Sequence, residues 1–354
     1  MDTPKLIVDR EKLQHNIEAM QDFARQQGIN LRPHIKAHKT AEIARLQVEA
    51  GANGITVAKL GEAEGMLAEG FNDILVAYPL IGAEKIERVR ALLDSGCHLT
   101  LMIDSRAGAT ALNDLRWPDG IDVLVKVNTG LNRCGLEPGP KLVDFVSWVH
   151  GLSNLRFRGI MTHAGHAYGA KSWGEVQEIA LSEGEQMVAA AAEIRDRGIP
   201  VEVVSVGATP TVMVAGAVPG VTEIRPGNYV FYDATQVMLG VVKPERCSLK
   251  VVTTVVSRPA PDRAIVDAGA KTLALDRGAH GSSGLSGHGL LSDPGWRLTR
   301  LSEEHGVIEG DNLPAAGSVI EIIPNHACPV VNLADRLELS TGAQWPVTVR
   351  GRTS

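Results

Sequence analysis

Long apolar runs and clusters of basic residues are both missing from this sequence of 354 residues. No apolar stretch approaches the length of a membrane span, and residues 1–10 lack the apolar core of a secretory signal peptide. The net charge is −6, without a basic run, which argues against nucleic acid and anionic membrane surfaces as partners. We therefore expect a cytoplasmic protein that binds neither nucleic acid nor membrane.

Cysteine is scarce as well. The four cysteines, Cys97, Cys134, Cys247 and Cys328, are far apart, a spacing typical of reduced thiols in the cytosol rather than of a disulfide framework. The contents of 44% hydrophobic and 21% charged residues are ordinary for a soluble globular protein. The length suits a large barrel followed by a second, smaller domain.

Short apolar runs alternate with amphipathic stretches in the first two thirds of the chain. The candidate strands are 31–35, 54–57, 73–77, 98–103, 122–127, 157–161, 201–205 and 222–224. Helical stretches separate them, for example 41–49, 61–69, 84–93 and 173–197, and many of these end on a glycine. Eight such units within about 200 residues favour a (β/α)8 barrel of the TIM type, with an open doubly wound sheet as the alternative.

The pattern changes after residue 236. Segments typical of strands follow at 251–257, 264–267, 319–323, 337–339 and 347–349, separated by turn residues. The sequence therefore predicts a barrel over 10–236 and a C-terminal β domain over 237–354, which strand 5–9 joins. The glycine- and serine-rich segment 278–289 predicts a mobile loop.

Polar residues follow the candidate strands, where a barrel carries its active site. Lys36 comes after the first strand, between His34 and His38. A single lysine at a strand end is usually a solvated residue. A lysine that is partly desolvated beside other cationic groups, however, has a lowered pKa and can form a Schiff base.

Small and polar residues follow the seventh and eighth strands. Gly207, Thr209, Gly227 and Asn228 offer backbone N–H groups and a hydroxyl where a barrel commonly binds phosphate. Each of these residues alone is also compatible with an ordinary tight turn, so the indication comes from their combination.

Five segments together resemble the D-threonine aldolase and D-serine dehydratase family. That family is similar to the N-terminal barrel of alanine racemase, among the fold type III pyridoxal-phosphate enzymes. The segments are 32–39, 132–135, 207–211, 225–229 and 324–329, and the resemblance runs from Leu6 to about Leu333. It implies pyridoxal 5'-phosphate as the cofactor, a small-molecule D-amino acid as the substrate, and a homodimer.

The resemblance also implies roles for single residues. Lys36, and not Lys39, would be the Schiff-base lysine. Arg133 would reach the phenolic oxygen of the cofactor, and Arg225 would face the pyridine nitrogen and keep it unprotonated. His163 would lie against the pyridine ring.

Further cofactor contacts follow from the same resemblance. Gly227 and Asn228 match backbone donors to the phosphate, with Thr209 and Gly207 beside them. Tyr168, after the sixth candidate strand, belongs to the same cofactor-binding set.

A possible metal pair lies near the end of the resemblance. A His-x-Cys pattern such as His326-x-Cys328 is by itself common by chance, and a free cysteine is usually a core residue. The same position in the family holds a metal. An imidazole and a thiolate together favour zinc, with manganese as the alternative. On an extended strand, residues two apart point to the same side, so we expect both to reach one ion.

The residues leave the reaction open. We favour retro-aldol cleavage to glycine and an aldehyde, of the D-threonine aldolase type, because His163 and His166 offer bases for the hydroxyl proton. Elimination from D-serine or D-3-hydroxyaspartate, to a 2-oxo acid and ammonia, would need only Lys36 and the metal. Cys328 favours this alternative, since the aldolases commonly carry a carboxylate at that position.

Two other functions fit less well. A racemase needs a second acid/base on the opposite face of the substrate, and the last tyrosine, Tyr232, precedes the β domain. A non-catalytic pyridoxal-phosphate carrier would be a single barrel, without the residues that follow position 236.

Overall fold

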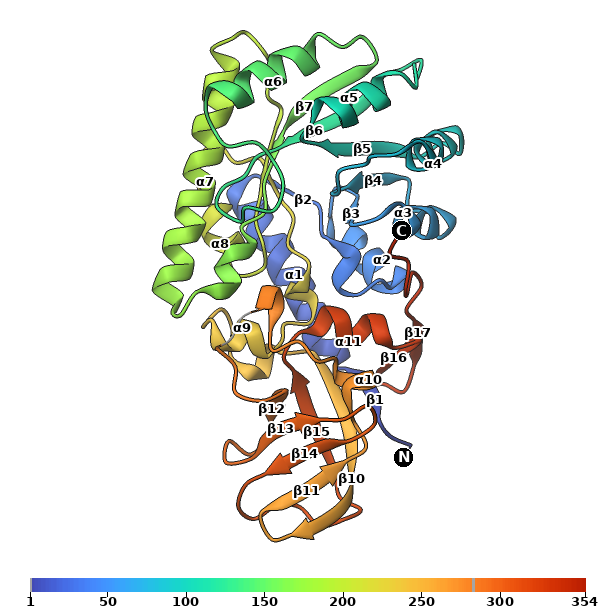
Figure 1. The fold of residues 1–354 in the computed structure, drawn as a ribbon, viewed down its shortest axis with the longest axis vertical. Coiled ribbons are helices and arrows are strands. Elements are labelled where there is room, and N and C mark those ends of the chain that lie inside the picture. The colour runs from blue at the N-terminus through green and yellow to red at the C-terminus, as the bar shows by residue number, and fades with distance from the viewer. Residues whose placement is uncertain (1, 282–283) are drawn as a thin grey trace.

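Eight parallel strands form the upper part of the molecule in Figure 1, within the residues that the computed structural model describes, 2–281 and 284–354. They are β2 (Asn30–Leu31), β3 (Ile55–Val57), β4 (Asp73–Val76), β5 (His98–Ile103), β6 (Ile121–Lys126), β7 (Leu155–Met161), β8 (Val203–Val206) and β9 (Glu223–Ile224). Their order is β2-β9-β8-β7-β6-β5-β4-β3. The N–H of Thr56 donates to the carbonyl of Pro33 at 2.8 Å, which brings β3 back to the chain after β2. The predicted barrel class is confirmed.

Helices cover the outside of this sheet. They are α1 (Arg10–Gln27), α2 (Ala41–Ala50), α3 (Leu60–Ala68), α4 (Ala83–Asp94), α5 (Arg106–Asn113), α6 (Pro140–His150), α7 (Trp173–Arg195) and α8 (Val212–Ala215). The short helix α9 (Ala234–Met238) lies at the junction with the lower part of the molecule (Figure 1). The two ends of α1 show what delimits a helix in this chain. At its start, the Asp9 side chain accepts a hydrogen bond from the N–H of Lys12, and at its end Gly28 adopts the left-handed conformation, with φ 68°. None of the helices in the described ranges has both the length and the apolar character needed to cross a membrane.

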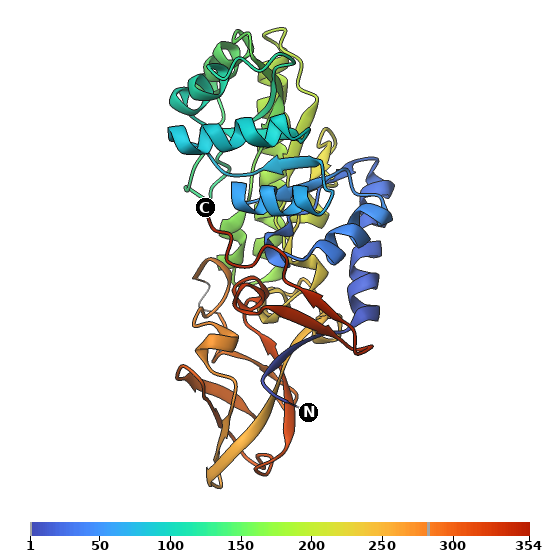
Figure 2. The same ribbon diagram turned by 90° about the vertical axis from the view of Figure 1, so that its right-hand side faces the viewer.

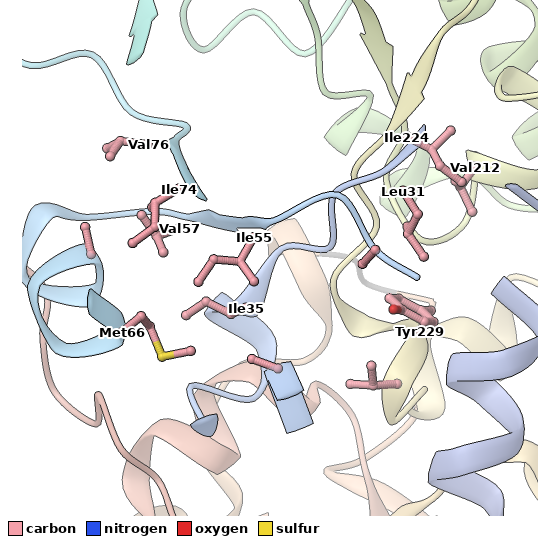
Figure 3. Close-up of a cluster of buried hydrophobic side chains, with 14 of the residues drawn as sticks. Leu31, Ile35, Ile55, Val57, Met66, Ile74, Val76, Val212, Ile224 and Tyr229 are labelled. Carbon is pink, nitrogen blue, oxygen red and sulfur yellow. The ribbon is translucent and has the colours of Figure 1, made fainter. Parts of the chain in front are cut away.

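Alternation along the strands produces two apolar layers. Outward-facing residues such as Ile55, Ile74 and Ile224 pack against helix residues such as Met66 and Val212 (Figure 3). Leu75, Met102, Leu124 and Met161 form a separate buried cluster that fills the barrel interior. These apolar side chains pack part of the interior, and buried polar residues of β8 and β9, Ser205 and Glu223, hydrogen-bond to each other.

The lower part of Figure 1 is mostly sheet. Its strands are β1 (Lys5–Val8), β10 (Leu249–Ala260), β11 (Arg263–Val266), β12 (Gly289–Leu291), β13 (Arg297–Leu301), β14 (Gly306–Glu309), β15 (Val319–Pro324), β16 (Arg336–Leu339) and β17 (Gln344–Pro346). The short helices α10 (Ala270–Leu273) and α11 (Ala327–Leu333) belong to it as well. The N-terminal β1 pairs with β10 and β16, so both ends of the chain contribute to this sheet.

The structure corrects several predicted elements. Residues 347–349 are not a strand, because the chain leaves the sheet after β17 and the N–H of Val349 donates to the carbonyl of Lys39. Strands β12, β13 and β14 were not predicted. The first barrel strand stops before Ile35, where a short 3₁₀ helix, Ile35–Ala37, begins. In segment 278–289, Ser282 and Ser283 lie outside the described residues.

The two parts meet along α11 and the C-terminal tail. Helix α11 packs against the 3₁₀ helix that carries Lys36. The tail then runs along α3, where the N–H of Gly61 donates to the carbonyl of Ser354 at 2.8 Å, and both views show the C-terminus beside the barrel (Figure 1, Figure 2). This packing places the start of α11 over the carboxyl end of the barrel.

Candidate active site

A cavity of about 620 Å³ lies where the carboxyl ends of the barrel strands face the start of α11. Residues that follow β2, β3, β4, β6, β7, β8 and β9 line it. Ten predicted site residues are in this lining: Lys36, Arg133, His163, Tyr168, Thr209, Arg225, Gly227, Asn228, His326 and Cys328. Sequence positions almost three hundred residues apart are thus brought to one chamber.

Lys36 belongs to the 3₁₀ helix Ile35–Ala37, and its N–H donates to Nδ1 of His34 at 3.4 Å. Burial lowers the pKa of Lys36; a negative charge on Cys328 opposes this effect, and Arg133 and Arg225 add to it. A lowered pKa increases the fraction of unprotonated amine, the form that attacks a carbonyl. The geometry therefore suits a nucleophilic lysine.

Lys39, the other lysine of the same segment, has a different environment. Its ammonium forms an ion pair with Oε1 of Glu62 at 3.2 Å, and the two side chains are 8% and 2% exposed. It does not belong to the cavity lining. Its amine is engaged by Glu62 and lies outside the cavity, so Lys39 is poorly placed to attack a carbonyl there.

Arg225 is held rigidly at the cavity wall. Its Nε donates to Oγ of Ser205 at 2.7 Å, and its guanidinium also donates to the carbonyl of Thr162. The Ser205 hydroxyl in turn donates to Oε1 of Glu223 at 2.5 Å. An arginine is donor-only and always charged, so this network presents a fixed cation to whatever lies in the cavity.

Polar atoms without partners surround the same chamber. Within the described ranges, Nε2 of His163, Oγ1 of Thr209 and Oδ1 of Asn228 are buried and have no hydrogen-bond partner. Leaving such groups unpaired is costly, and buried polar groups in native proteins are nearly always satisfied. The three atoms indicate that a polar ligand completes the site.

Gly227 lies too close to a neighbouring segment to carry a side chain. A Cβ at this position would lie 2.8 Å from the carbonyl oxygen of His34. The loop after β9 therefore packs directly on the chain that leads to Lys36. Any side chain at Gly227 would move one of these two segments.

Two predicted residues do not reach the cavity lining. The N–H of Gly207 donates to Oε1 of Glu183 at 2.9 Å, so it is engaged by protein rather than available to a phosphate. His166 turns away toward Gly130, where a Cβ would lie 3.0 Å from the imidazole. Gly207 therefore holds its turn in place through its hydrogen bond to Glu183. His166 lies outside the cavity lining, so it is not placed to act as a base there.

The His326 and Cys328 pair is not on an extended strand, contrary to the prediction. Strand β15 ends at Pro324, His326 is the N-cap residue of α11, and Cys328 lies in its first turn. Both side chains nevertheless line the cavity. The turn into the helix, rather than strand alternation, brings the imidazole and the thiol to one side.

Asp276 supports His326 and was missed at the sequence level. Its Oδ2 lies 2.6 Å from Nδ1 of His326, an interaction between positions fifty residues apart. A carboxylate on one ring nitrogen orients the other nitrogen for metal binding. Across the described residues, no group of three or more histidine, cysteine or acidic side chains could hold a metal, so the pair would leave most of the coordination shell open.

His280 is a further cavity residue that the sequence did not reveal. Its ring stacks on Tyr168, with centroids 5.2 Å apart, and lies 5.7 Å from the ring of His163. Burial, together with the charge of Lys36, lowers the pKa of His280 to about 4. Gly165 makes room for it, because a Cβ there would be 2.9 Å from Cε1 of His280.

Cationic side chains dominate the lining. They are Lys36, Lys59, Lys126, Arg133 and Arg225, and no carboxylate of the described residues lines the cavity. Burial and the charge of Arg225 lower the pKa of Lys126 to about 7. The strand alternation of β6, with Leu124 in the barrel interior, could have placed Lys126 here from sequence. Such a chamber suits ligands with several negative charges.

Comparison with known proteins agrees with this geometry. Residues 8–235 match the family described as "Alanine racemase, N-terminal domain", and residues 248–339 match "Putative serine dehydratase domain". The chain belongs to the alanine racemase N-terminal family. Membership indicates a pyridoxal-phosphate enzyme, and the relatives of this group are lyases.

Two relatives match along nearly their full length. D-threo-3-hydroxyaspartate dehydratase of Delftia sp. (strain HT23) is 36% identical over 98% of this chain and 93% of its own. D-threonine aldolase of Arthrobacter sp. is 30% identical over 99% of this chain and 93% of its own. The resemblance inferred from the sequence segments is confirmed.

Solved structures give the same result. D-threonine aldolase from Filomicrobium marinum has a TM-score of 0.91 and 31% identity, over 100% of this chain and 97% of its own. The Delftia dehydratase, at a TM-score of 0.90, is known in a metal-free form in which one cysteine is replaced by alanine. A second variant replaces a histidine two positions before that cysteine, the spacing of His326 and Cys328.

Proposed function

We propose that this chain is a metal-assisted pyridoxal-phosphate lyase that acts on β-hydroxy-D-amino acids. The observation that carries the proposal is the single chamber in which a buried lysine, an oriented arginine and the His326–Cys328 pair converge. The relatives' names, aldolase and dehydratase of hydroxylated D-amino acids, support the same class of substrate.

The lining residues fit the cofactor. Lys36 would hold it covalently, while Thr209, Gly227 and Asn228 would hold its phosphate and satisfy the unpaired Oγ1 of Thr209. When bound, pyridoxal phosphate supplies an electron sink for negative charge that develops at the substrate Cα. The guanidinium of Arg225 stays protonated and can only donate hydrogen bonds. If it faces the pyridine nitrogen, it would leave that nitrogen unprotonated.

The β domain would add the metal. His326 and Cys328 would hold a divalent ion, zinc or manganese, which supplies Lewis acidity toward the substrate hydroxyl. Asp276 fixes the orientation of the His326 ring through its 2.6 Å contact. The metal-free variant of the Delftia enzyme supports a metal at this position.

Proton transfer would involve His163 and Lys36. His163 lines the cavity with an unpaired Nε2, and burial lowers its pKa well below the ordinary value, so its ring is uncharged and would accept a hydrogen bond from the substrate hydroxyl. This favours retro-aldol cleavage to glycine and an aldehyde as the first candidate reaction. In that reaction Lys36 would return a proton to Cα.

Dehydration is the second candidate, and Cys328 favours it together with the 36% identity to the Delftia dehydratase. Here Lys36 would remove the Cα proton, and the products would be a 2-oxo acid and ammonia. The reaction needs no base for the hydroxyl proton.

One assay separates the two reactions. The metal-loaded holoenzyme is given D-threonine, D-serine and D-3-hydroxyaspartate separately, and glycine, aldehyde, 2-oxo acid and ammonia are measured. Glycine with an aldehyde supports cleavage, and 2-oxo acid with ammonia supports dehydration. Absence of all four products from every substrate contradicts the proposed function.

We also propose that the enzyme is a cytoplasmic homodimer. Family resemblance supports the dimer, and the four free cysteines of the described chain are compatible with a reducing compartment. Light scattering of the eluting holoenzyme tests the subunit number, and a monomeric mass would contradict the dimer.

A further inference from the structure

Lys59 and Tyr78 form a pair at the rim of the cavity. Lys59 lies in the turn between β3 and α3, and Tyr78 follows β4. The ammonium of Lys59 is 3.8 Å from the centroid of the Tyr78 ring, and both residues line the cavity. The aromatic face stabilises the cation in this position without neutralising it.

The charge of Lys59 is not matched by the protein. Within the described ranges no carboxylate lies within ion-pair distance of its ammonium. Lys39, on the other side of the first turn of α3, is paired with Glu62. Glu62 thus neutralises Lys39, whereas the ammonium of Lys59 faces the cavity without a protein carboxylate beside it in the described residues.

Lys59 and Tyr78 stand apart from Thr209, one of the residues proposed to hold the phosphate. In the closed order of eight strands, β3 stands opposite β7 and β4 opposite β8. Lys59 and Tyr78 therefore lie across the mouth from Thr209, which follows β8. The cations assigned to the cofactor, Arg133 and Arg225, follow other strands, β6 and β9, so the proposed cofactor contacts leave Lys59 unassigned.

We propose that Lys59 is a specificity-determining residue that binds the side-chain carboxylate of a β-hydroxy-D-amino dicarboxylic acid. This inference rests on the proposed function, since it assumes an amino acid bound to the cofactor that Lys36 would hold. The side-chain carboxylate of such a substrate would form the ion pair that Lys59 lacks within the described residues. A substrate with a neutral side chain would leave this cation facing only the Tyr78 ring and water.

Binding of unreactive amino acids tests the inference. D-Aspartate and D-alanine lack the β-hydroxyl, so neither can be cleaved or dehydrated, and both can be titrated against the holoenzyme by its visible absorbance. We expect D-aspartate to bind more tightly than D-alanine. Lys59→Gln should lower the ratio of the two affinities by about 10- to 100-fold, as for loss of a charge-assisted contact.

Matched variants give the control. Lys59→Arg keeps the cation and should keep most of the ratio, whereas Lys141→Gln removes an exposed lysine of α6, away from the cavity, and should leave the ratio as in the wild type. Tyr78→Phe keeps the ring and should keep the ratio, and Tyr78→Leu should lower it. An unchanged ratio in Lys59→Gln, or an equal loss for both ligands, overturns the inference.

Failure of this inference and of the proposed function are distinguishable. If β-hydroxy-D-amino acids are cleaved or dehydrated but the affinity ratio does not depend on Lys59, the function stands and the specificity role falls. If no product forms but D-aspartate binding depends on Lys59, the lyase proposal falls and the carboxylate site stands. If neither D-amino acid binds, both fall.

Discussion

The two walls of the cavity are built differently. On the barrel wall, Arg225 is fixed by Ser205, by the carbonyl of Thr162 and by the nearby Glu223, all at strand ends. On the wall from the β domain, His326 begins a short helix and has one supporting carboxylate, Asp276. Adjacent strands of a closed sheet hold their ends in register, whereas a loop or helix start can be altered without disturbing the sheet.

This difference suggests a division of labour. The barrel wall would hold the cofactor, which all members of such a family share, and the β-domain wall would direct the reaction through a metal. Functional change would then concentrate in the second wall, because its residues are few and lightly supported. The expected outcomes below sharpen or break that division, from the largest effect to the smallest.

Replacement of Lys36 should have the largest effect. We expect Lys36→Ala to lower turnover by more than about 10³-fold, because it removes both the attachment point and the Cα acid/base. The visible absorbance of the bound cofactor should be lost on dialysis. Borohydride reduction followed by peptide mapping locates the attachment, and a reducible adduct on Lys39 in the variant would contradict the assignment.

Removal of the metal should strongly lower turnover and leave cofactor binding by the barrel wall unchanged. Chelation or His326→Ala should lower turnover by about 10²- to 10³-fold, since the Lewis acid supplies several kcal/mol. The absorbance of the cofactor and the thermal midpoint should change little. Unfolding on chelation would instead show a structural metal and break the proposed division. Cys328→Asp should retain some activity and shift the preference toward manganese.

Loss of the carboxylate behind His326 should weaken the metal without removing it. We expect Asp276→Asn to raise the dissociation constant of the metal by about 10- to 100-fold, the usual cost of losing a group that orients a metal-binding histidine. Added metal should restore turnover. The control is Asp335→Asn at the exposed ion pair with Arg350. A variant that saturates with metal as readily as the wild type would rule out this role for Asp276.

A smaller effect is expected in the pH dependence of stability, through His38, which lies two residues after Lys36. His38 is fully buried, its Nδ1 accepts from the N–H of Thr40 at 3.2 Å, and its Nε2 is 3.2 Å from Oε1 of Gln47. Burial lowers its pKa to about 4. An unfolded histidine takes a proton near its ordinary pKa, so the folded state loses stability as pH falls from about 6.5 toward 4.

The measurement is chemical denaturation at two pH values. Between pH 7 and pH 5 the free energy of unfolding should fall by about 2 kcal/mol on account of His38 alone. His38→Gln should reduce this pH-dependent loss, whereas His15→Gln, at an exposed position of α1, should not. An equal pH dependence in the His38 variant and the wild type would show that folding does not lower the pKa of His38.

Much of the barrel wall was predictable from sequence. Apolar runs placed the strands to within a few residues, and barrel strands carry their functional residues at one end, so Lys36, Thr209 and Arg225 were expected together. The β domain was harder, since short strands such as β13 and β14 have too little pattern to detect. The bend at Ile35 and the helix start at His326 were missed because both belong to short helices, of three and seven residues, which show little periodicity.

By itself the sequence determined the order of strands and helices in the barrel, the segments that mark the family, and the residues at the strand ends. These properties follow from local periodicity and from adjacency along the chain. Tertiary structure alone decided that Asp276 supports His326, that Glu62 neutralises Lys39 and leaves Lys59 charged, and that His166 faces away while His280 reaches the cavity. Each of these outcomes depends on which segment lies within a few ångströms of another far along the chain, because charge pairing and burial act through space.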